Sequence, residues 1–97
     1  MKSTGLRPEL IEKEQVAALR FPNGDVLTDN EEKNRRKSEL ERAMVLGNMD
    51  HNKVKIIFSD ETGPKMIETT IWAVTQERIV LKSGMVIPIR RIHEIIT

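Results

Sequence analysis

The second half of the chain alternates short runs of β-branched and aliphatic residues with turn residues, and this pattern restricts the fold more than any other feature. Five runs have the length and composition of strands, namely 54–58, 66–75, 78–82, 85–89 and 92–96. The segments between them, such as Asp60–Pro64 and Ser83–Gly84, favour turns. Because connections this short join antiparallel neighbours, the pattern predicts a small antiparallel sheet.

Pro88 lies inside the fourth run and cannot donate a main-chain hydrogen bond to a neighbouring strand. A proline in this position is expected at the edge of a sheet or at a sharp bend. Five short strands with a bend before the last one are typical of a small closed or nearly closed barrel. The inward positions predicted for the barrel core are Val54, Ile56, Phe58, Ile67, Ile71, Ile79, Leu81, Ile87 and Ile92.

The first half of the chain has helical signals. Pro8 and Glu9 suit the first turn of a short helix, and Phe21–Asp25 favours a turn. Residues 16–27 either end this helix or form a small hairpin. We expect residues 1–27 to be an N-terminal arm, partly mobile for want of strong burial signals, and residues 28–97 to be the folded domain.

A second helix is predicted from a capping box at Thr28–Glu31, or from a second frame starting at Asp29, to a C-terminal cap at Gly47. Its first half has no apolar residue, and Leu40 and Met44 supply a stripe only in the last two turns. We therefore expect the last two turns to pack on the barrel. The first turns should project into solvent or onto a partner.

Composition narrows the function classes. The chain has 97 residues, a formal net charge of +1 and no cysteine. The lack of cysteine excludes disulfides and thiolate zinc sites and favours a reducing cytoplasm. No apolar run is long enough to span a membrane, so no membrane role is expected. A charge near neutral is unlike that of a dedicated nucleic-acid binder, although the part from residue 51 onward is mildly basic.

The candidate binding residues are cationic or aromatic. Arg90 and Arg91, with Lys82 and Arg78 nearby, are candidates for an anion-binding patch. Trp72 is a candidate stacking platform, or else a packing residue. The basic run that includes Arg35 and Arg36 could meet phosphates, but the glutamates around it allow self-pairing instead.

No catalytic, metal-binding or cofactor-binding residue is predicted. The histidine–carboxylate neighbours Asp50–His51 and His93–Glu94 have no accompanying ligand set or nucleophile. The glycines at 63 and 84 are isolated turn residues rather than a phosphate-binding loop. No cofactor and no small-molecule substrate are therefore expected.

Residues 39–97 resemble the Sm-like branch of the small SH3-like barrels, a family that includes bacterial RNA chaperones. The resemblance rests on the order of helix and five bent strands, and on the final segment Val86–Ile95, in which an apolar-x-apolar triplet precedes a basic residue. It implies an SH3-like or Sm-like five-stranded barrel and RNA binding. The Lys-His pair that enters the last strand in the RNA chaperones is replaced here by Ile89 and Arg90, and their base-stacking aromatic has no counterpart. Small bacterial proteins that end in a Trp…Gly…Ile-Pro-Ile pattern are also similar.

These observations favour a non-catalytic interaction module that binds a macromolecular partner in the cytoplasm, and the partner is expected to be a protein. The alternative is an RNA-binding Sm-like protein. Several strands are apolar on both faces, since Ile57, Val80 and Val86 oppose the core positions. We therefore expect self-association or a stable complex through the barrel edge.

Overall fold

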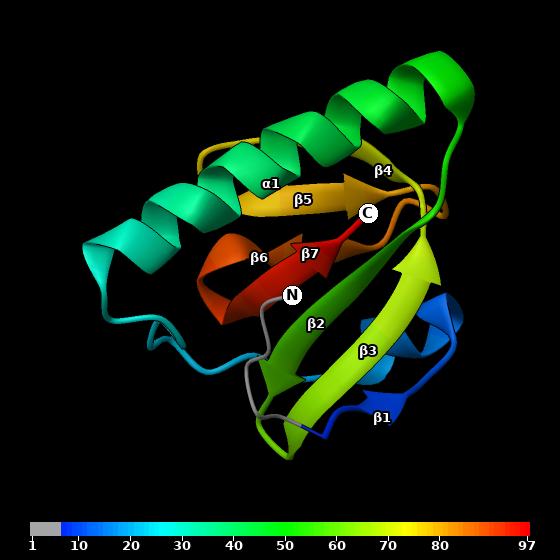
Figure 1. Ribbon diagram of the computed structural model, residues 1–97. Helices are drawn as coiled ribbons and strands as arrows, with labels where there is room; N and C mark the ends of the chain where they lie inside the picture. The colour runs from blue at the N-terminus through cyan, green and yellow to red at the C-terminus, as the bar shows by residue number, and fades with distance from the viewer. Residues whose placement is uncertain (1–6) are drawn as a thin grey trace.

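The computed structural model describes residues 7–97, which form an α+β fold with two sheets. The elements, in chain order, are β1 (Glu9–Leu10), the 3-10 helix η1 (Lys13–Ala18), α1 (Asn30–Asp50), β2 (Val54–Asp60), β3 (Gly63–Thr69), β4 (Ile71–Val74), β5 (Arg78–Leu81), β6 (Val86–Pro88), the 3-10 helix η2 (Ile89–Arg91) and β7 (Ile92–Ile96). One sheet has the order β1-β3-β2-β7, and the other has the order β4-β5-β6 (Figure 1).

The predicted five-stranded barrel is wrong, because the seven strands of the described region form sheets of four and three strands with no closed barrel. The run predicted as one strand over 66–75 is two strands, β3 and β4, which belong to different sheets. Thr70 alone separates them, so the chain passes from one sheet to the other there. The two sheets contribute to one core and are not joined into a continuous ladder.

The helix α1 contacts β4 in one sheet and β7 in the other. The N–H of Ile95 donates to the Glu39 carboxylate at 3.2 Å, and the carbonyl of Ile92 accepts from Arg36 at 2.9 Å. Helix side chains therefore satisfy main-chain groups of β7 that a further strand would otherwise pair. This arrangement is a physical reason why the sheet stops at β7.

The predicted N-terminal α-helix is also wrong. Glu9–Leu10 pairs in parallel with β3, and the Ile11 N–H continues the pairing by donating to the Met66 carbonyl at 3.0 Å. Only a 3-10 helix, η1, follows; it ends at Ala18, within the 16–27 range, and the rest of that range forms no hairpin. The segment is bound to the sheet through hydrogen bonds and through Val16, which is 2% exposed. Pairing with β3 therefore replaces the local helical hydrogen bonds that the sequence favours.

The helix α1 begins one residue after Asp29, whose carboxylate accepts from the Glu31 N–H at 3.1 Å. It does not end at Gly47 as predicted but continues to Asp50. His51 takes the left-handed conformation at its C-terminus, with φ 56°. Gly47 instead marks a close approach, because a Cβ there would lie 2.7 Å from the Ile71 carbonyl oxygen.

The predicted core is confirmed. All nine inward positions named from the strand pattern are buried, Leu40 packs with them as expected, and Val16, Ala43 and Ile95 join them, whereas Met44 of the helix stripe is only partly buried and lies outside this core. The two faces of β5 differ as expected, with Ile79 and Leu81 inside and Val80 partly exposed. The inner faces of both sheets and α1 thus enclose a single apolar interior. The outer face of β4–β5–β6 lies outside this interior and is partly exposed to solvent.

Candidate partner-binding surface

Arg36 is a residue of α1, faces the N-terminal segment and is only 6% exposed. Its guanidinium forms a bidentate ion pair with Asp25, at 3.0 and 2.9 Å, in addition to the bond to the Ile92 carbonyl. Burial by itself would raise the pKa of Asp25, but the hydrogen bonds from Arg36 and from the Leu27 N–H lower it below its ordinary value. Arg36 therefore holds the fold together and is not available as the predicted phosphate contact.

Arg90 and Arg91 also fasten the N-terminal segment. Arg90 Nε donates to the Pro22 carbonyl at 3.1 Å. Arg91 Nε donates to the Ser59 carbonyl at 3.0 Å, and its Nη1 donates to the Gly24 carbonyl at 2.9 Å. The two arginines therefore do not form the predicted anion patch together, because each donates hydrogen bonds to main-chain carbonyls of the protein itself.

Three of the predicted residues do lie on one surface. Trp72, Arg78 and Lys82 belong to the outer face of the β4–β5–β6 sheet, or to its immediate continuation, opposite the buried Ile79 and Leu81. The register irregularity between Ile71 and Ala73 places Trp72 outside the regular pairing. The indole is 50% exposed, which is large for a tryptophan in a strand.

An aliphatic ladder crosses the same face. Ala73 pairs with Val80, and Val80 pairs with Val86, so three apolar side chains lie in line across three strands. Val86 is 40% exposed. We define the outer face as Trp72, Ala73, Arg78, Val80, Val86 and Pro88. Its centre is apolar and it has a cation at the Arg78 end, while Lys82 follows β5 at the other end.

Arg90 approaches one end of the outer face. It lines a hollow of about 140 Å³ together with Arg78, Val86, Pro88 and the acidic Glu77. The Nε of Arg90 donates to the Pro22 carbonyl, and the same side chain lines this hollow. Among the predicted residues, Arg90 is therefore the one that contacts both the N-terminal segment and the end of the outer face. Arg35 is exposed on α1, apart from this group.

A second surface feature was missed by the sequence analysis. A groove of about 480 Å³ runs between α1 and the turn after β4. Its lining residues are Lys33, Arg36, Lys37, Leu40, Glu41, Met44, Val74, Thr75, Gln76 and Ile89. The stripe of Leu40 and Met44 was visible in the sequence, but its partners across the groove, from Val74 onward, lie thirty or more residues away along the chain.

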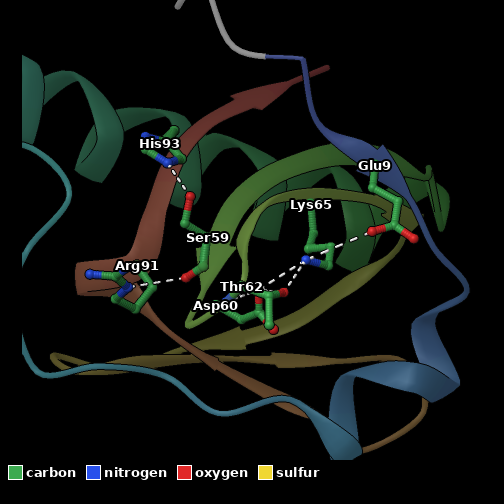
Figure 2. Close-up of polar contacts among 7 residues, drawn as sticks. All are labelled: Glu9, Ser59, Asp60, Thr62, Lys65, Arg91 and His93. Atoms are coloured by element: carbon green, nitrogen blue, oxygen red, sulfur yellow. Dashed lines mark hydrogen bonds and ion pairs between the residues drawn. The ribbon is translucent and has the colours of Figure 1, made fainter.

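Figure 2 shows a polar cluster on β2 and its neighbours. Ser59 Oγ lies 2.7 Å from His93 Nε2, which is the spacing of a nucleophile and a base. The pKa of His93 is lowered, first by burial and then by the charges of Arg91 and Arg36. Neither Ser59 nor His93 lines the groove or the outer face. The pair connects β2 to β7, and we assign it to the fold.

Lys65 forms the second part of this cluster. Its ammonium contacts Asp60 at 3.0 Å and Thr62 Oγ1 at 2.7 Å, and Glu9 lies at 3.8 Å (Figure 2). Burial raises the pKa of Asp60, but the hydrogen bonds from Lys65 and Thr62 outweigh it, so the pKa lies below its ordinary value. The contacts join the tip of the β2–β3 hairpin to β1.

Among the side chains that the structure describes, no three from His, Cys, Asp or Glu gather as a metal-binding group. In the same part of the chain, no helix combines the length and the apolar character needed to cross a lipid bilayer.

Comparison of the chain with protein-family models, with curated proteins and with solved structures finds no match. The resemblance to Sm-like barrels therefore receives no test from relatives.

Proposed function

We propose that this protein is a non-catalytic interaction module of the cytoplasm that binds a protein partner through the outer face of β4–β5–β6. The observation that supports this proposal most directly is Trp72, which is 50% exposed and precedes Ala73, the first residue of the Ala73–Val80–Val86 ladder. A tryptophan and aligned aliphatic side chains in water cost hydration free energy, and burial against a partner recovers it. Tryptophan is also among the residues that most often dominate binding energy at protein interfaces.

A protein suits this face better than RNA does. Base recognition by stacking requires aromatic side chains, and among the six residues of the outer face only Trp72 is aromatic. The other central side chains are aliphatic and match apolar side chains of a protein. A symmetric contact between two copies through this face would bring Arg78 and Lys82 near the same two cations of the other copy, and like charges disfavour that arrangement. A different protein is therefore favoured over a second copy.

The experiment compares capture of cytoplasmic proteins by the wild-type chain and by Trp72→Ser, with quantitative mass spectrometry. Leu10→Ser is the matched control, because Leu10 is 67% exposed but lies on β1. We expect proteins retained by wild type and by the control to be lost from Trp72→Ser. Equal retention by all three chains would contradict binding through the outer face.

RNA binding is tested with polyuridylate at increasing salt concentration. Neutralised phosphates release counterions, so an RNA-binding protein shows a steep loss of affinity with salt. We expect no tight binding to polyuridylate. Binding that is steeply salt-dependent and lost in Trp72→Ser would support the RNA alternative instead. Light scattering at several concentrations is expected to give the mass of one chain.

A further inference from the structure

The groove beside α1 has cations on one wall and an apolar floor. Lys33 and Lys37 are four residues apart and line the same wall. Arg36 lies between them, but its charge is already paired with Asp25. Glu41 is the acidic residue on the groove lining, so the two lysines leave this wall with a net positive charge. The floor consists of Leu40, Met44, Val74 and Ile89.

The opposite wall is the turn between β4 and β5. Thr75 and Gln76 line it and offer a hydroxyl and a carboxamide. The Thr75 hydroxyl already donates to the Arg78 carbonyl at 3.1 Å, which keeps this turn in place. The groove volume is within the range of roughly 300–1,000 Å³ that ligand sites usually have. The groove is a partly open surface hollow and not an enclosed cavity.

We propose that this groove binds a short acidic segment of a protein partner that carries apolar side chains between its carboxylates. The apolar side chains pack on Met44, Val74 and Ile89, and the carboxylates contact the Lys33 and Lys37 ammonium groups. Charge complementarity selects acidic segments over basic ones. The lining has no aromatic residue on which a nucleobase could stack, which disfavours single-stranded RNA as the occupant.

This site is separate from the outer face, because the groove lining shares no residue with it. The proposal therefore does not depend on the proposed function. One partner could use both surfaces, since the turn that carries Thr75 and Gln76 leads directly into β5 and Arg78. The two surfaces can be inactivated independently by substitution.

The probe is a short dye-labelled peptide in which glutamate alternates with leucine, and binding is measured by fluorescence anisotropy. A peptide with lysine in place of each glutamate is the charge control. We expect the acidic peptide to bind the wild-type protein at least about tenfold more tightly than the basic peptide, since exposed ion pairs add modest energies that sum over two sites.

The charge-reversing double variant Lys33→Glu/Lys37→Glu is expected to weaken binding of the acidic peptide by about tenfold or more. Lys53→Glu/Lys55→Glu makes the same charge change at exposed positions outside the groove and should leave affinity within about twofold. Met44→Gln tests the floor and should also weaken binding. Lys33→Gln/Lys37→Gln serves as a milder variant if charge reversal disturbs the fold, which circular dichroism checks.

Equal affinity for the acidic and basic peptides, or equal affinity of the Lys33/Lys37 and Lys53/Lys55 variants, would overturn the groove proposal. Loss of peptide binding in Trp72→Ser with no loss in the groove variants would also overturn it. That last result would place the peptide on the outer face and support the proposed function. Conversely, peptide binding that survives Trp72→Ser supports the groove and leaves the outer face to its own experiment.

Discussion

Adjacent residues on one helix can have opposite roles, and Arg35 and Arg36 are an example. Arg35 is exposed, whereas Arg36 is buried and contacts Asp25 and the Ile92 carbonyl. Both were grouped in the sequence as candidate phosphate contacts. The difference arises because side chains at neighbouring positions on a helix point about 100° apart, so that only Arg36 faces the N-terminal segment and β7.

Replacement of Arg36 by glutamine should destabilise the protein by about 3 kcal/mol. The substitution leaves the Asp25 carboxylate without its partner in a partly buried site. Arg35→Gln removes the same charge at an exposed position and should change stability by no more than about 0.5 kcal/mol. Urea unfolding of the three proteins measures the difference. Equal losses for the two variants would show that the ion pair contributes nothing specific.

His93 should make stability dependent on pH in the weakly acidic range. Its pKa is lowered in the folded state, so the unfolded chain takes up a proton more readily than the folded protein does. The free energy of unfolding should therefore fall as the pH drops from the ordinary histidine pKa of 6.5 through the lower folded value. Protonation of Asp25 and Asp60 lowers the free energy of unfolding only at lower pH, because the pKa of each is lowered from the ordinary value of 3.8.

Replacement of His93 by glutamine tests this effect. Glutamine keeps a polar group near Ser59 Oγ but does not titrate. The unfolding free energy of His93→Gln, measured by urea titration at several pH values, should be flatter than that of wild type between about pH 5 and 7. Parallel curves for the two proteins would mean that another group is responsible.

At the scale of single elements, α1 shows how packing overrides a capping signal. A glycine that follows an apolar stripe suggests a helix end, yet α1 continues past Gly47 for three residues to Asp50. Gly47 is required for contact, because a side chain there would meet the Ile71 carbonyl and the Thr70 methyl group. The helix thus approaches β4 at the point where the chain changes sheets.

Gly47→Ala should destabilise the protein by roughly 1–3 kcal/mol, the usual cost of overpacking. In an exposed helix the same change would stabilise by about 1 kcal/mol through helix propensity. A Cβ would lie 2.7 Å from the Ile71 oxygen, so α1 or β4 has to move. Asn48→Ala is the control at the next, exposed position and should be neutral or slightly stabilising. Thermal unfolding distinguishes the two signs.

At the scale of the whole molecule, the N-terminal segment is part of the domain. It adds β1 to one sheet, places Phe21 at a ring-centroid distance of 6.0 Å from Phe58, and is held by Arg36, Arg90 and Arg91. These contacts cross the boundary that was expected at residue 27 between an arm and the folded domain. The edges expected to mediate association are partly blocked, because helix side chains contact the edge of β7 and Pro88 interrupts that of β6.

The N-terminal segment should therefore exchange its hydrogen-bonded amides slowly, contrary to the mobility expected from the sequence. The Ile11 N–H donates to Met66 and the Val26 N–H donates to Arg90, at 3.0 and 2.8 Å. Hydrogen exchange followed by NMR should show protection at these two positions and fast exchange at the exposed Asn23 and Gly24. Fast exchange at Ile11 and Val26 would restore the picture of a mobile arm.

The sequence by itself determined which residues form the core of the strands and where most turns fall. Inward positions recur with the period of the backbone, so a local pattern of β-branched residues is enough to identify Ile56, Ile67 or Ile79 as buried. The outward positions Val80 and Val86 were found in the same way, but Ile57, which was also expected on the outward side, is buried. These inferences need no knowledge of which strands are neighbours.

Only the tertiary structure decided how the strands divide into two sheets, what the arginines bind and where the groove lies. Each of these features depends on segments that are distant in sequence. Arg36 and the carbonyl of Ile92 are 56 positions apart, and Met44 meets Val74 and Ile89 across the groove. A charged side chain has the same local signature whether it is buried against a carbonyl or free in water. Its role is settled only by the groups that the fold brings within hydrogen-bond distance.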